Sequence, residues 1–203
     1  MARRFIDKLD ITLFGDTCNF FHSEWNLEAA DQLSRDTPRL FVYLMRQDDP
    51  RKCTSAKLFK FSRAISITRP SMIPRLAIVL SPYATCLLSP TDRETALSHG
   101  ICAVDCSWEK APSVFKKRFS RNERRLPILL AANPTHYAQQ SVLSSVEALA
   151  GALSILGIKE RAASILSLFK WGPAFLALNR EPLEDYAAAK NASEVEEAQR
   201  TYF

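Results

Sequence analysis

The stretch from Leu88 to Trp108 constrains the fold more strongly than any other part of this 203-residue chain. Ser89 and Asp92 stand three residues apart, at the spacing of a capping box that begins a helix. Gly100 is placed to end that helix, and the apolar run at 101–104 predicts a buried strand directly after it. A capped helix that leads into a buried strand is typical of parallel α/β proteins.

Two side chains able to contact a small molecule follow that predicted strand. Asp105 stands at its carboxyl end, and Trp108 comes three residues later. Ligands of open α/β sheets bind outside the carboxyl ends of the strands, where both residues are expected. The alternative for Asp105 is a turn or capping acid, and the alternative for Trp108 is a core aromatic residue. We favour ligand contacts because an acid at the end of an apolar strand is costly without a partner.

The rest of the chain extends this pattern. Short apolar runs predict strands at 40–45 and 77–80, and Thr54 is placed to begin a helix. A further apolar run at 126–132 ends at Asn133-Pro134. Ser144 and Glu147 stand at the spacing of a second capping box, before the next helix. The sequence therefore predicts an α/β fold with a mostly parallel sheet flanked by helices and a helical C-terminal third, whose helices are expected at 145–156, 159–168, 173–179 and 182–190.

Charge indicates an anionic partner. The net charge is +5, and the segment 51–75 holds seven basic residues and no acid. A second run at 110–125 holds seven basic residues with Glu123 as its single acid. Either run alone fits a solvated surface, but two runs that flank the candidate binding segment favour a nucleic-acid face. The candidates for phosphate contacts are Lys116, Lys117, Arg118, Arg121, Arg124 and Arg125.

The cysteines and the N-terminus exclude several classes of protein. The five cysteines are odd in number and include no CxxC pair, which argues against a zinc site and a disulfide framework and favours a reducing compartment. Cys102 and Cys106 are expected to be packing residues. Asp7 and Asp10 interrupt any leader pattern, and no apolar stretch reaches membrane-spanning length. We expect no metal, no membrane partner and a cytoplasmic location, with the nucleus as a second possibility.

Four blocks in order carry a family pattern: Asp49-Pro50-Arg51-Lys52-Cys53-Thr54, the 88–108 stretch, 126–148 with Ala131-Ala132-Asn133-Pro134, and 169–179 with Phe169-Lys170-Trp171-Gly172. Together they resemble the small-subunit ribosomal RNA aminocarboxypropyltransferases. Four ordered blocks are far more specific than one short motif. The chain departs from the family pattern at Ser55, which replaces a glycine, and at 138–141, which replaces Gly-x-Pro followed by an aromatic residue.

The resemblance implies a fold detail that periodicity does not show. Its C-terminal part is related to the knotted SPOUT-class RNA methyltransferases, in which the chain threads a trefoil knot. We expect an N-terminal extension at 1–38 without an assigned role, an α/β part at 39–98, and a SPOUT-like cofactor-binding and helical part at 99–203. A monomer is expected.

The resemblance also implies an activity. The family transfers the 3-amino-3-carboxypropyl group of S-adenosylmethionine to a methylated pseudouridine of small-subunit rRNA and releases methylthioadenosine, without a metal. The partner is then small-subunit rRNA or the pre-ribosomal small subunit. Two alternatives remain open: a SPOUT-type RNA methyltransferase, and a non-catalytic RNA-binding ribosome assembly factor.

By the same resemblance, the donor pocket consists of Thr54, Val104, Trp108, Leu126, Ser141 and Ser145. Thr54 is expected to hold the amino acid moiety, and the apolar Val104 and Leu126 are expected to flank the adenosine. The Trp108 indole face against a sulfonium gains about 0.5 to 2 kcal/mol. Asp105 is the catalytic candidate, which either hydrogen-bonds the donor or accepts the proton of the attacking nitrogen.

Overall fold

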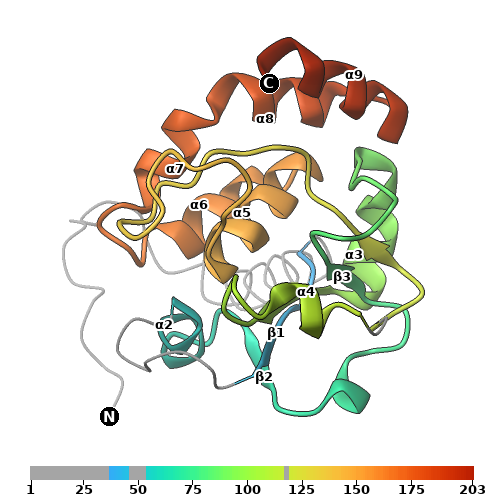
Figure 1. The fold of residues 1–203 in the computed structure, drawn as a ribbon, viewed down its shortest axis with the longest axis vertical. Helices are drawn as coiled ribbons and strands as arrows, with labels where there is room; N and C mark the ends of the chain where they lie inside the picture. Colours follow the sequence, from blue (N-terminus) through green and yellow to red (C-terminus); the bar gives the residue numbers. More distant parts are fainter. Residues whose placement is uncertain (1–36, 46–53, 117–118) are drawn as a thin grey trace, which may run out of the picture. The chain divides into compact units, whose positions relative to one another are not determined.

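The computed structural model describes residues 37–45, 54–116 and 119–203 (Figure 1). Contacts within the chain group Thr37–Phe203 into one compact unit. Residues 49–53 of the first family block, and the RNA-binding candidates Lys117 and Arg118, lie outside the described residues.

Five parallel strands form one sheet in the order β2-β1-β4-β3-β5. The predicted α/β class with a parallel sheet is confirmed. In this sheet β4 lies between β1 and β3. The part expected at 99–203 therefore contributes a central strand between two strands of the part expected at 39–98. The strands are β1 Leu40–Leu44, β2 Ile65–Ile67, β3 Ile78–Leu80, β4 Ile101–Asp105 and β5 Glu123–Arg124.

Eight α-helices lie within the described residues, and the last third of the chain is helical, as predicted. None of them combines the length and the apolar character needed to cross a membrane. The helices are α2 Thr54–Lys60, α3 Arg93–His99, α4 Ala111–Val114, α5 Ser145–Ile155, α6 Lys159–Leu166, α7 Gly172–Leu178, α8 Arg180–Ala188 and α9 Ala192–Tyr202, with short 3-10 turns at Pro70–Met72 and Pro90–Asp92.

The sheet separates two apolar clusters, because alternate residues of a strand point to opposite faces. In β1, Leu40 and Val42 belong to the larger cluster, which includes α5, whereas Phe41 and Tyr43 belong to the smaller one. Cys102 of β4 is fully buried in the smaller cluster, and burial raises the pKa of its thiol to about 12. This thiol stays neutral near pH 7, in agreement with its predicted packing role.

The capping box before α3 and the glycine after it are both present, as the sequence predicts. The backbone N–H of Ser89 donates to the Asp92 carboxylate at 3.2 Å, and the capping box is complete. Gly100 follows α3 with a φ of +87° and allows the chain to turn directly into β4.

Gly100 and Gly157 both have a positive φ, and replacement by alanine is expected to destabilise the protein more at Gly100 than at Gly157. A Cβ at Gly100 would lie 2.6 Å from the carbonyl oxygen of Arg39 and from the Phe41 ring, whereas one at Gly157 would meet only the flexible Arg93 side chain, at 3.4 Å. Gly157→Ala should cost about 1 to 2 kcal/mol of unfolding free energy from the backbone alone. Gly100→Ala should cost about 1 to 3 kcal/mol more because it also overpacks. Urea denaturation of both variants checks this, and equal losses would contradict it.

Candidate functional site at the carboxyl edge of the sheet

Because all five strands are parallel, their carboxyl ends share one edge of the sheet. At this edge β1 and β4 are neighbours, with Leu44 opposite Asp105, and the Met45 N–H donates to the Asp105 carbonyl oxygen at 3.2 Å. The chain continues from β1 to β2 on one side and from β4 to β5, which lies on the other side beyond β3. Connections that diverge from adjacent strands leave a crevice between them, the usual ligand site of open α/β sheets.

Asp105 and Trp108 lie where that crevice is expected. Asp105 is half-buried as the last residue of β4, on the face of Ile101 and Ala103 by strand alternation. Val104 is on the opposite face and packs against the smaller apolar cluster. A ligand that contacts both Val104 and Asp105 must therefore lie across the end of the strand. Trp108 is 38% exposed, so an indole surface is available to a ligand.

Thr54 begins α2, the helix that follows β1, as predicted. Its neighbour Ser55 is fully buried, and its hydroxyl has no hydrogen-bond partner in the part of the chain that the structure describes. A buried hydroxyl without a partner is unfavourable. This unsatisfied group lies directly after Thr54, in the first turn of α2.

Leu126 follows β5 by two residues and is half-buried against the larger cluster. It packs near α5, where Gly151 leaves room: a Cβ at Gly151 would lie 2.7 Å from Leu129 and 4.0 Å from Leu126. In turn α5 packs against both α2 and β4. This helix is thus the common neighbour of the elements that hold Thr54, Val104 and Leu126.

After Leu126 the chain is extended but lies outside the sheet, and side chains satisfy its backbone. The Asn179 side chain accepts a hydrogen bond from the Leu130 N–H at 2.7 Å and donates one to the Leu130 carbonyl oxygen at 2.8 Å. The Ile128 N–H donates to Gln199 at 2.8 Å, and its carbonyl accepts from the Tyr186 hydroxyl at 3.2 Å. Burial, followed by the charges of Tyr202 and Asp185, raises the pKa of the Tyr186 hydroxyl.

The loop that follows contains Ser141, which adopts a left-handed backbone with a φ of 59°. Ala138 does the same at 60°. Two non-glycine residues in this conformation store about 1 to 2 kcal/mol each, so the loop must be held by other contacts. The Ser141 N–H donates to the Leu129 carbonyl and the Ala138 N–H to the Ala131 carbonyl, which fixes the loop beside the extended segment.

Glu147 ties this loop to α5. Its fully buried carboxylate accepts from the N–H groups of Ala132 and Asn133 at 2.7 and 2.9 Å and from the Asn133 amide at 2.8 Å. It also accepts from the backbone and the hydroxyl of Ser144 at 2.7 and 2.6 Å. The predicted capping box of Ser144 and Glu147 is therefore present, but the bonds to 132–133 were not predicted. A lone glutamate on an otherwise apolar helix was their only sequence signal. Ser145 is half-buried beside this network.

The basic candidates have different surroundings. Lys116 and Arg121 are exposed, and Arg125 is half-buried with its backbone bonded to Cys86 and Leu88. Arg124 instead forms a fork with the buried carboxylate of Asp92, at 2.9 to 3.1 Å. Its guanidinium holds β5 to the start of α3, so the predicted RNA contact at Arg124 competes with a structural ion pair.

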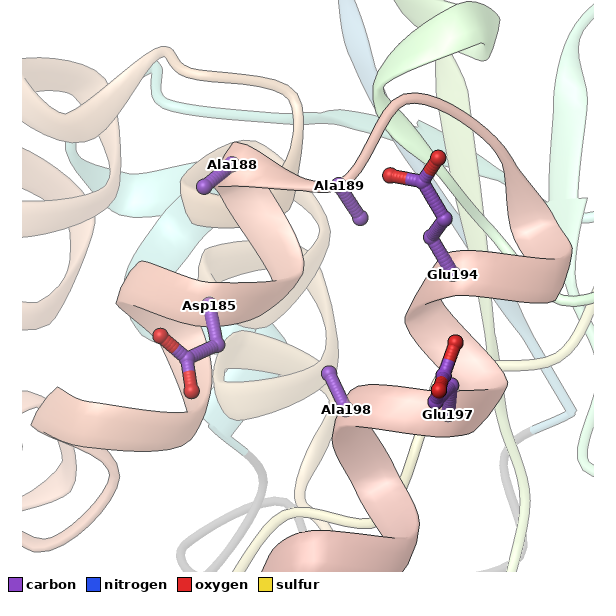
Figure 2. A pocket seen from close by; sticks show the side chains of 6 residues that line it. All are labelled: Asp185, Ala188, Ala189, Glu194, Glu197 and Ala198. Atoms are coloured by element: carbon purple, nitrogen blue, oxygen red, sulfur yellow. The ribbon is translucent and has the colours of Figure 1, made fainter.

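No group of three His, Cys, Asp or Glu side chains that could hold a metal ion occurs within the described ranges. A separate cavity of about 390 Å³ lies between α8 and α9 (Figure 2). It is lined by Asp185, Ala188, Ala189, Glu194, Glu197 and Ala198, none of which is a candidate site residue. The three acidic side chains in this lining would repel an RNA phosphate or a donor carboxylate.

Comparison with known proteins decides the family. Residues 78–203 match the family model described as the C-terminal region of ribosome biogenesis proteins. A 16S rRNA aminocarboxypropyltransferase of Methanosarcina acetivorans is 46% identical over 171 residues, which cover 83% of this chain and 96% of that protein. The chain belongs to the 16S rRNA aminocarboxypropyltransferase family.

Two further comparisons support this assignment to the family. The protein of Methanocaldococcus jannaschii is 43% identical over 165 residues, or 81% of this chain and 96% of its own length. The solved structure of the SAM-dependent rRNA:acp-transferase Tsr3 from Vulcanisaeta distributa matches with a TM-score of 0.73 and 40% identity, over 81% of this chain and 97% of that one. The five-stranded parallel sheet and its helices are thus the fold of this family.

Glu147→Gln is expected to lower the unfolding free energy by about 2 to 4 kcal/mol, because an amide nitrogen replaces an oxygen that accepts hydrogen bonds from buried donors. Glu160→Gln makes the same chemical change at an exposed position in the first turn of α6 and should cost no more than about 1 kcal/mol, because only its favourable interaction with the helix dipole is lost. Thermal and urea unfolding of both variants provide the measurement. Equal stability of the two variants would contradict the role of Glu147.

Proposed function

We propose that this protein transfers the 3-amino-3-carboxypropyl group of S-adenosylmethionine to a base of small-subunit rRNA during ribosome maturation. The observation that carries the proposal is 46% identity, over 83% of the chain, to a protein named 16S rRNA aminocarboxypropyltransferase. The strand order, in which the connections from the neighbours β1 and β4 diverge, supports a donor site at the carboxyl edge of the sheet.

The sulfonium of the donor activates the adjacent carbon of the aminocarboxypropyl group for displacement. The bond from that carbon to sulfur breaks as the bond to the acceptor nitrogen forms, methylthioadenosine leaves, and the nitrogen loses a proton. The protein then has to orient the nitrogen in line and exclude water. Trp108 supplies an indole face toward the sulfonium, and Asp105 positions the donor or takes the proton.

The remaining pocket residues have supporting roles in this proposal. Thr54 holds the amino acid moiety, with Val104 and Leu126 beside the adenosine and Ser141 and Ser145 on the loop and helix that Glu147 ties together. The described candidates for phosphate contacts are Lys116, Arg121, Arg124 and Arg125, of which Arg124 already pairs with Asp92. We further propose a methylated pseudouridine as acceptor, a trefoil knot in the C-terminal part, a monomer and a cytoplasmic location.

The decisive experiment is a reaction with S-adenosylmethionine and immature small-subunit rRNA that is already methylated at the target pseudouridine. Methylthioadenosine together with an aminocarboxypropyl adduct on the RNA is the expected result. S-adenosylhomocysteine would instead identify a methyltransferase. RNA binding without either product would identify a non-catalytic assembly factor.

Trp108→Ala is expected to weaken S-adenosylmethionine binding by about 2- to 30-fold, the equivalent of a cation–π contact of about 0.5 to 2 kcal/mol. The melting temperature should change little because the indole is 38% exposed. Trp171→Ala is the matched control: this indole packs on Phe169 with ring centroids 5.2 Å apart, so its loss should lower stability and leave donor affinity unchanged. Calorimetric titration and thermal unfolding measure both effects. Unchanged donor affinity in Trp108→Ala would exclude the indole from the site.

A further inference from the structure

Two arginines from distant parts of the chain meet where α2 has ended and α6 begins. The Arg161 guanidinium donates to the backbone carbonyl of Arg63 at 3.3 Å, across 98 positions of sequence. Arg63 belongs to the basic run at 51–75, which supplied none of the phosphate-contact candidates. Both residues are partly buried.

Each of these guanidiniums keeps an unsatisfied donor. The Nε atoms of Arg63 and Arg161 are both buried and have no hydrogen-bond partner. Across residues 37–45, 54–116 and 119–203, neither side chain forms an ion pair with a carboxylate, and the neighbouring Glu160 is exposed. Buried donors without partners cost free energy, so this arrangement is incomplete as a purely structural feature.

Electrostatics make the pair still more costly. Desolvation, followed by repulsion from Arg63, lowers the pKa of Arg161 below its ordinary value. Arg161 also lies in the first turn of α6, where the helix dipole disfavours a cation. Desolvation, like-charge repulsion and the dipole all act in the same direction, and a bound anion would relieve all three.

We propose that Arg63 and Arg161 together bind a backbone phosphate of the RNA. This inference rests on the proposed function for the identity of the RNA. A guanidinium offers several N–H donors in a fixed plane, which suits the oxygens of a phosphate better than any other group in RNA. The two Nε atoms are buried, but both residues stay partly exposed, so a phosphate would bind at the exposed part of the two side chains and supply the missing negative charge.

Arg63 and Arg161 lie away from the residues proposed for catalysis. Arg63 lies two residues before β2 begins at Ile65, so it is near the amino ends of the strands, whereas Asp105 ends β4 at the carboxyl edge. A phosphate bound here belongs to a part of the RNA away from the modified base. The pair therefore contributes to RNA affinity and to the register of the RNA on the protein, and leaves donor binding unaffected.

Arg63→Gln tests the proposal because it removes one charge and keeps the carbonyl that Arg161 contacts. RNA affinity should fall by about tenfold, and the slope of log K against log salt should decrease by about one. Affinity for S-adenosylmethionine should be unchanged, and the melting temperature should stay the same or rise because like-charge repulsion is relieved. Arg161→Gln should weaken RNA binding in the same way. The matched control is Arg180→Gln, an exposed arginine of α8, which should bind RNA as the wild type does.

Filter binding of a small-subunit rRNA fragment over a salt series gives the affinities. Wild-type RNA affinity and salt slope in both variants would overturn the proposal, as would a lower melting temperature with unchanged RNA binding. Stabilisation of the wild type by inorganic phosphate alone, without an RNA effect in the variants, would identify a small-anion site instead. Failure of the proposed function is seen separately, as absence of methylthioadenosine from the wild-type reaction.

Discussion

The extended segment at 128–133 depends on side chains from distant parts of the chain for several of its backbone hydrogen bonds, in addition to those that the loop at 138–141 supplies. Asn179, Tyr186 and Gln199 serve Leu130 and Ile128, while Glu147 serves the end of the segment. Buried backbone groups without partners cost free energy, so the segment holds its course only when the helices are in place. Side chains from the last third of the chain thus supply hydrogen-bond partners for the segment that follows Leu126.

Glu147 has a second consequence, because its carboxylate joins the segment to the start of α5 and therefore to the loop between them. That loop contains two left-handed residues, Ala138 and Ser141, whose strain must be held by its surroundings. The helix α5 in turn packs against α2 and β4, the elements that position Thr54 and Asp105. One buried carboxylate therefore links the proposed pocket to the core.

Local signals in the sequence were reliable where both partners lie within one turn. The capping boxes at Ser89 and Ser144 span three residues and formed as predicted. The strand β2 was not predicted because only Ile67 among its three residues is buried, and α9 was not predicted because Val195 is its only buried residue. The ion pair of Arg124 could not be predicted from the sequence either, because its partner Asp92 is 32 positions away and nothing in the basic run indicates it.

The sequence by itself determined the α/β class, the parallel sheet, the helical last third and, through its four ordered blocks, the family. These depend on periodicity, caps and motif order, which are properties of neighbouring residues. Only the tertiary structure decided the strand order that makes β1 and β4 neighbours, the five bonds to Glu147, and the contact between Arg63 and Arg161. Each of these joins residues far apart in the chain, and such contacts leave no local pattern because they exist only after the chain has packed.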